Sequence, residues 1–285
     1  MNGIKEIIIS SKYNRELIEE HTKKFKQQVK KIKVVATPDA DNFGDSLRTV
    51  ASMNLINDDF VIVRGDLISN INIHDALKMH YHIREEESKK ENQTTETRKI
   101  KTIMTKLFLK RSHTNPLQDP VSEITLMMDN QTKEILKYQS LVSENRKQVK
   151  SIHVNEEHMP LLKSYAPPLL KGHQQKDESL KCNNTYPNGS SIVIRQDLID
   201  CEIAICTSEV LDHFGDNFDK SNFKDGFINW TYESEIIEHR MRAFEIEQQG
   251  SYVARIFNPR SYFQVTQDII KRRAYPLVID KKSVD

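Results

Sequence analysis

The chain is poor in glycine, with eight glycines among 285 residues and no two of them within ten positions of each other. Loops that cradle a nucleotide phosphate need clustered glycines, because the backbone must approach the pyrophosphate closely. The sequence contains no Gly-x-Gly-x-x-Gly and no Walker loop. Its glycine content therefore argues against the common classes of nucleotide-binding enzyme.

Cysteine, excess charge and long apolar runs are also scarce. The three cysteines, Cys182, Cys201 and Cys206, are too few and too irregular for a disulfide framework. The 42 basic residues balance 41 acidic ones, so we expect neither nucleic acid nor an anionic membrane as the main partner. No run approaches the roughly 18 apolar residues of a membrane helix, and no signal peptide is visible. These features predict a cytosolic or nuclear protein.

Strand and helix patterns alternate through the first ninety residues. Because short joints connect them, neighbouring strands should run parallel, and helices should cover both faces of the sheet. The sequence thus predicts an α/β fold with a mostly parallel, Rossmann-like sheet. The strands are expected at Lys5–Ser10, Lys31–Thr37 and Phe60–Arg64, and the helices at Asn14–Val29, Asp45–Ile56 and His74–Glu87.

The remainder continues as the same domain, which we place at residues 1–280, with insertions near 85–101 and 143–189. Further strands are expected at Thr102–Leu109, Glu123–Met128, Glu134–Gln139, Ser190–Arg195, Cys201–Cys206, Met241–Glu247 and Ser251–Phe257. Further helices are expected at Ser208–Phe214, Phe227–His239 and Ser261–Arg273. Cys201 and Cys206 lie five apart in one strand, so we predict two buried cysteines on opposite faces.

The ten histidines do not form a metal motif. His153 and His158 are five residues apart, whereas two ligands on one helical face need a spacing of four. His80 and His82 are interpreted as a solvated helix end. We expect no metal site from either group.

Asp66 directly follows the strand at Phe60–Arg64. An acidic residue there lies at the carboxyl edge of a parallel sheet, where α/β folds place ligands, and it could hold Mg²⁺. It could equally cap the next turn through its side chain. The sequence leaves both interpretations open.

Asn217, Phe218 and Asp219 lie between two predicted helices. An aromatic side chain among acids and an amide in a surface loop is typical of a protein contact. The alternative is an ordinary helix–helix turn with Phe218 packed inward.

Several segments, in order along the chain, resemble the epsilon subunit of eukaryotic translation initiation factor two B. The two most specific are the Asp-Leu-x-Asp-Cys run at 197–201 and the Asn-Phe-Asp triplet at 217–219. The others are Gly44–Arg48, Gly65–Ile73 and Ala274–Leu277.

This resemblance implies a nucleotidyltransferase-like domain related to sugar-nucleotide pyrophosphorylases. It implies a cytosolic role in guanine-nucleotide exchange on initiation factor two. Asn217, Phe218 and Asp219 would contact the GTP-binding subunit of initiation factor two. The gamma subunit and other subunits of factor two B would be further partners. Asp66 would be a relic of an ancestral metal ligand.

The chain also departs from the pyrophosphorylase pattern. It resembles the fold from the second strand onward, without the first strand and its glycine-rich, arginine-containing signature. In place of the Glu-Lys-Pro motif it has Leu136-Lys137-Tyr138-Gln139. Residues 281–285 would be a tail leading toward a β-helix domain and an exchange-catalysing domain that this chain does not contain. We therefore predict a scaffold or interaction domain that is not an enzyme and needs no cofactor. The alternative is a sugar-phosphate nucleotidyltransferase.

Overall fold

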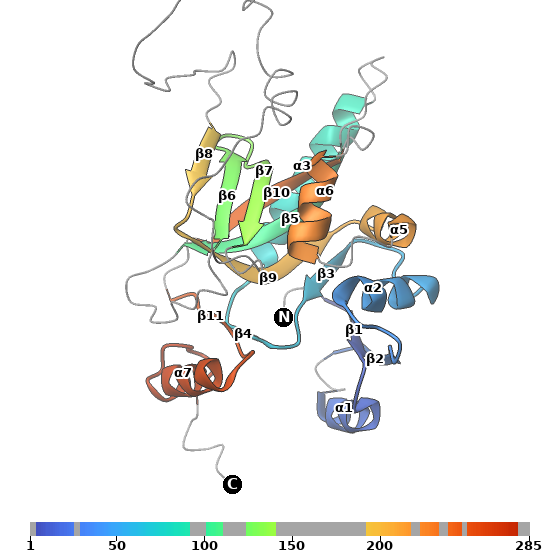
Figure 1. Cartoon of the computed structure of the whole chain (residues 1–285), viewed down its shortest axis with the longest axis vertical. Helices are drawn as coiled ribbons and strands as arrows, with labels where there is room; N and C mark the ends of the chain where they lie inside the picture. The colour runs from blue at the N-terminus through green and yellow to red at the C-terminus, as the bar shows by residue number, and fades with distance from the viewer. Residues whose placement is uncertain are drawn as a thin grey trace, which may run out of the picture.

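The computed structural model describes eight segments of the chain, which are drawn in colour in Figure 1. Four strands form the main sheet in the order β10 (His239–Ile246), β5 (Lys101–Lys110), β9 (Leu198–Cys206) and β3 (Phe60–Val63). The described segments are residues 4–25, 29–91, 101–110, 124–140, 192–217, 223–233, 239–246 and 250–278.

The directions of the main-sheet strands largely agree with the prediction. β10 pairs with β5 in parallel, whereas β9 pairs antiparallel with both β5 and β3. Consequently β3, β5 and β10 all run one way, and β9 alone runs the other. Within this described sheet, β9 is the strand that departs from the mostly parallel arrangement predicted. This strand enters from the short strand β8 (Ile192–Arg195) after a two-residue connection and crosses the sheet in the reverse sense.

A second, two-stranded parallel sheet is formed by β1 (Glu6–Ser11) and β2 (Lys31–Ala36), which are joined by helix α1 (Arg15–Thr22). Helix α2 (Phe43–Ser52) then leads to β3. Among the described residues, β1 pairs only with β2 and β3 only with β9. One edge of each strand is thus left without a described partner.

Two smaller sheets complete the fold. An antiparallel sheet of β7 (Ile135–Ser140), β6 (Ile124–Asp129) and β8 lies next to the main sheet, with β6 in contact with β9 and β7 in contact with β10. β4 (Leu67–Ser69) pairs antiparallel with β11 (Val253–Arg255), and helix α7 (Pro259–Ile270) packs against β11. The sequence did not predict β4, because its three residues are too few to show a periodic pattern.

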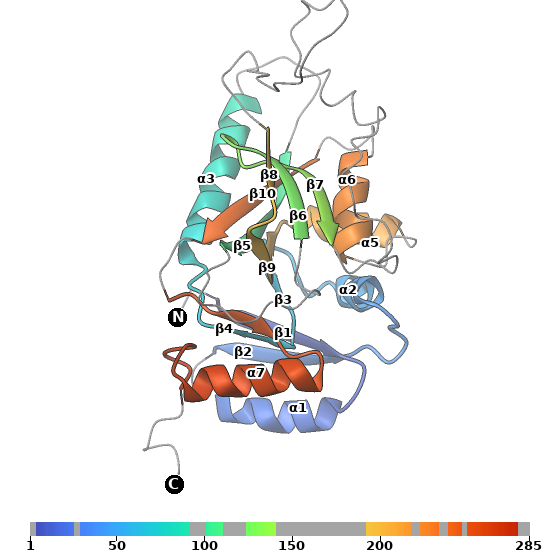
Figure 2. The ribbon, with the colours of Figure 1, turned by 60° about the vertical axis from the view of Figure 1, so that its left-hand side comes forward.

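Helices cover both faces of the main sheet, as predicted. Helix α3 (His74–Glu91) packs on one face through Ala76 and Leu77. Helix α5 (Glu209–Asp216), a π-helical turn at Phe223–Ile228 and helix α6 (Asn229–Glu233) cover the other face. Figure 2 shows α3 on one side of the sheet, with α5 and α6 on the opposite side.

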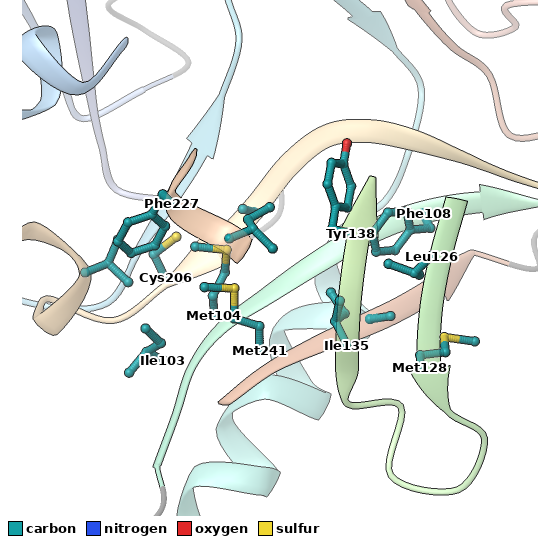
Figure 3. Close-up of a cluster of buried hydrophobic side chains, with 14 of the residues drawn as sticks. Ile103, Met104, Phe108, Leu126, Met128, Ile135, Tyr138, Cys206, Phe227 and Met241 are labelled. Carbon is teal, nitrogen blue, oxygen red and sulfur yellow. The ribbon is translucent and has the colours of Figure 1, made fainter. Parts of the chain in front are cut away.

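The two faces form separate cores. Cys206 packs with Met104, Phe227 and Met241 in the larger cluster, which Figure 3 shows. Cys201 packs in the smaller cluster beneath α3. Both thiols are fully buried, so the prediction of two core cysteines on opposite faces is confirmed. Burial raises the pKa of each thiol, which keeps both in the protonated form.

Other element boundaries differ from the predictions. α3 continues to Glu91, into the first predicted insertion. The helix predicted at Phe227–His239 is wrong at its end, because His239 already belongs to β10. The second predicted insertion at 143–189 and the tail at 281–285 lie outside the described residues.

The histidine interpretation also needs a correction. His80 is completely buried, and its Nδ1 lies 2.8 Å from the hydroxyl of Thr105 on β5. His82, by contrast, is solvated as predicted and faces Glu86. Two residues along a helix turn the side chain by about 200°, so His80 faces the sheet while His82 faces water.

Candidate functional site

The predicted contact triplet begins where α5 ends. The backbone N–H of Asn217 donates to the carbonyl of His213 at 3.2 Å, and its side-chain amide donates to the same oxygen at 2.9 Å. Asn217 thereby closes the helix and fixes the point from which the chain leaves it. Phe218 and Asp219 lie outside the described residues.

A histidine pair supports the end of α5. His213 Nε2 lies 2.7 Å from Nδ1 of His239, the first residue of β10, and the ring of Trp230 stands edge-on at 6.0 Å from His213. Burial lowers the pKa of both imidazoles, so both are neutral at pH 7 and one donates to the other. The sequence analysis missed this pair, because 26 residues separate the two histidines and no spacing rule joins them.

The inner side of α5 rests on stacked aromatic rings. The centroid of Phe214 is 4.3 Å from that of Phe227 and 6.2 Å from that of Phe223. Arg48 on α2 donates to the carbonyl of Phe214 at 3.2 Å. Close aromatic packing and this hydrogen bond hold the end of α5 in place against the sheet.

Asp66, the second predicted site residue, lies between β3 and β4 and is bound by arginines. Arg255 on β11 donates to its Oδ2 from Nη2 at 2.7 Å and from Nε at 3.1 Å. Arg64 donates to Oδ1 at 3.3 Å. Although partial burial opposes ionisation, the two guanidiniums keep the pKa of Asp66 below its ordinary value.

Arg255 bridges to a second carboxylate. Its Nη1 lies 3.3 Å from Oε1 of Glu202, which sits in the middle of β9. Glu202 has a φ of +55°, a left-handed conformation that is rare for a residue with a side chain. The register of β5 and β9 shifts beside it, between Lys106 and Phe108. Such an outlier in a strand is typical of a site where the backbone is bent to aim a side chain.

The neighbouring Asp200 has its own partners deeper in the core. Its Oδ2 accepts a hydrogen bond from Tyr138 at 2.7 Å and lies 3.0 Å from the ammonium of Lys106. Its Oδ1 accepts from the backbone N–H of Glu202 at 2.8 Å. Lys106 is almost completely buried. Burial opposes its charge, but the carboxylates of Asp200 and Glu202 together outweigh that effect and keep the pKa of Lys106 raised.

These two regions do not form one site. Figures 1 and 2 both show α5 and β4 in different parts of the molecule. In the described part of the chain, no group of three or more histidine, cysteine or acidic side chains could hold a metal ion. No described helix is long and apolar enough to cross a membrane. The arrangement offers a supported helix end at α5 and a carboxylate paired with two arginines beside β4.

Comparison with known proteins adds the family context. No protein-family model matches the chain. The chain is 28% identical over 237 residues to translation initiation factor eIF2B subunit epsilon of Dictyostelium discoideum, which covers 83% of this chain. It is 23% identical over 249 residues to the subunit of the same name from Schizosaccharomyces pombe, covering 87% of this chain. The chain is similar to the epsilon subunit of eIF2B. This confirms the resemblance drawn from the sequence. The chain spans only 27% and 30% of the length of these two epsilon subunits.

Solved structures confirm the fold of this epsilon-like domain. An apo UDP-glucose pyrophosphorylase superposes with a TM-score of 0.54 at 8% identity, covering 95% of this chain and 83% of that one. An inositol-1-phosphate CTP transferase from T. maritima gives a TM-score of 0.50 at 12% identity, covering 98% and 80%. At these identities the match concerns fold alone, and it confirms the nucleotidyltransferase-like α/β fold.

Proposed function

We propose that this chain is an interaction domain of an epsilon subunit of eIF2B and that it contributes to guanine-nucleotide exchange on initiation factor two in the cytosol. The observation that carries the proposal is the similarity to two epsilon subunits over more than four fifths of the chain. The gamma subunit and the other subunits of eIF2B would be its partners within the complex. Initiation factor two would be the partner on which the complex acts.

The contact with initiation factor two is assigned to Asn217, Phe218 and Asp219. Asn217 emerges from a helix end that the His213–His239 pair and the Phe214 stack hold in place. A rigid base lowers the ordering cost of a short contact loop, so few residues can contribute much of the binding energy.

This role does not require nucleotidyl transfer. Asp66, the residue where a pyrophosphorylase-like enzyme would need an available carboxylate, is occupied by Arg255 and Arg64. We therefore propose that the domain is not an enzyme. The alternative, a sugar-phosphate nucleotidyltransferase, predicts Mg²⁺-dependent pyrophosphate release from nucleoside triphosphate and sugar phosphate. A turnover that disappears in Asp66→Asn would establish that alternative.

The interaction is tested by measuring the affinity of the chain for purified initiation factor two. Phe218→Ala and Asp219→Ala should each weaken binding by about 1–3 kcal/mol, as expected for hot-spot residues. Asp212→Ala is the matched control, because Asp212 is an exposed acid on α5 itself. The melting temperatures of all variants should stay within a few degrees of each other. Unchanged binding in both loop variants would place the contact elsewhere on the domain.

A further inference from the structure

The charges around Asp66 and Glu202 follow a simple pattern. The two carboxylates together carry a charge of −2, and the guanidiniums of Arg255 and Arg64 together supply +2. Arg255 contacts both acids, with Nη2 at 2.7 Å from Asp66 and Nη1 at 3.3 Å from Glu202. A divalent cation held between two carboxylates would produce the same balance.

We infer that Arg255 is a built-in cation, which holds the Asp66 and Glu202 carboxylates together and closes this edge of the sheet to divalent metal ions. Mg²⁺ commonly binds proteins through only one or two carboxylates, with water and substrate oxygens completing its shell. Asp66 and Glu202 provide that number, but the Arg255 guanidinium already contacts Oδ2 of Asp66 and Oε1 of Glu202.

Arg255 is held in this position from several sides. Its guanidinium lies 5.6 Å from the ring centroid of Phe257, and its side chain is only 20% exposed. The backbone N–H of Ile256, the next residue, donates to the carbonyl of Asp66 at 2.8 Å. The β4–β11 pairing thus fixes the arginine opposite Asp66. A guanidinium that donates to two carboxylates in fixed positions is not readily displaced by a hydrated metal ion.

The left-handed backbone of Glu202 completes the arrangement. The residue is buried, with its side chain 6% exposed, so a charge there needs a nearby partner. Lys106 pairs with the neighbouring Asp200, and Arg255 forms an ion pair with Glu202. The left-handed backbone at Glu202 brings its carboxylate to Arg255. Arg255 in turn links β11 to β9 through this ion pair.

The test uses Mn²⁺ as a probe of the full 285-residue chain, with binding followed by electron paramagnetic resonance and by calorimetry. The wild-type protein should show no saturable binding that depends on Asp66. Arg255→Gln and Arg255→Ala should bind Mn²⁺ saturably, at least about tenfold more tightly than any residual binding to the wild type, since the guanidinium no longer contacts the two carboxylates. Their melting temperatures should rise with Mn²⁺, while that of the wild type should not.

Three controls make the result specific. Adding Asp66→Asn to Arg255→Gln should abolish the new binding. Arg255→Lys keeps a positive charge and should still exclude Mn²⁺. Arg242→Gln, an arginine paired with Glu87 at 3.4 Å elsewhere in the structure, should create no site.

Three kinds of result would overturn the inference. The first is saturable Mn²⁺ binding by the wild type that Asp66→Asn removes, because the edge would then be open. The second is absence of Mn²⁺ binding in both neutral Arg255 variants. If neither neutral variant folds, with or without Mn²⁺, a metal ion cannot replace the guanidinium and the inference fails as well. None of these outcomes depends on binding to initiation factor two, so the proposed function stands or falls separately.

Discussion

His80 should make the stability of this domain strongly dependent on pH. Its imidazole is fully buried between α3 and β5, and Thr105 occupies Nδ1. Within the described structure, Nε2 has no hydrogen-bond partner. Burial lowers the pKa of His80 from 6.5 to about 4, although Asp59 at 4.0 Å favours the charged form. The folded protein therefore holds His80 neutral.

The sign of the effect follows from the depressed pKa. Below about pH 6.5 the unfolded chain takes up a proton at His80 while the folded chain does not, so the free energy of unfolding decreases as the pH falls. The loss continues until the pH reaches about 4, where the folded protein is protonated too. At 1.36 kcal/mol for each pKa unit, the whole shift corresponds to about 3 kcal/mol.

We would measure urea denaturation of the wild type and of His80→Asn between pH 7 and pH 4. Other groups titrate in this range, so the informative quantity is the difference between the two profiles. The wild type should lose about 3 kcal/mol more than the variant across this range. His82→Asn is the matched control, because it removes a solvent-exposed histidine from the same helix. Parallel profiles for the wild type and His80→Asn would refute the reasoning.

Three further predictions concern the core and the sheet edges. Lys106→Met should destabilise the fold by about 3–5 kcal/mol in chemical denaturation, because it removes the ammonium that pairs with the buried Asp200. An unchanged free energy of unfolding would contradict this. Phe214→Ala should lower the free energy of unfolding by about 3–5 kcal/mol, because it opens a cavity in the aromatic stack, and the denaturation midpoint should fall. An unchanged midpoint would show that the stack is not rigid. Ile7 and Val63 are 36% and 55% exposed on strands that have one edge without a partner in the described part of the chain, so Ile7→Lys and Val63→Lys should slow the rise of light scattering on heating. Equal or faster aggregation would exclude these edges as the cause.

The sequence was sufficient to predict features that depend on local pattern. The apolar run at β9 predicted a buried strand with Cys201 and Cys206 on opposite faces, and the structure confirms this. β-branched runs located β1, β2 and β3 to within one residue at each end. β9 is readable because burial on both faces of a sheet imposes its own composition, and β1 to β3 are readable because β-branched residues favour strands.

Features that depend on distant residues could not be read in this way. The burial of His80 requires the position of β5, and the pairing of Asp66 with Arg255 joins residues 189 positions apart. The positive φ of Glu202 has no local signal, since glutamate is an ordinary residue for a strand and glycine is the usual residue for that conformation. For the candidate contact, the sequence identified the triplet, but the histidine pair beneath it became visible only in three dimensions.

The position of β9 in the middle of the main sheet has a consequence for the order of folding. β3 and β5 are made early in synthesis, yet each pairs with β9, whose residues come roughly a hundred positions or more later in the chain. Until residue 206 has left the ribosome, both apolar strands lack their central neighbour. Folding is slow when such long loops must close before any strand pairing forms. During translation the apolar strands also stay exposed and prone to aggregation. We therefore expect slow refolding and a strong need for chaperones while the chain is being made.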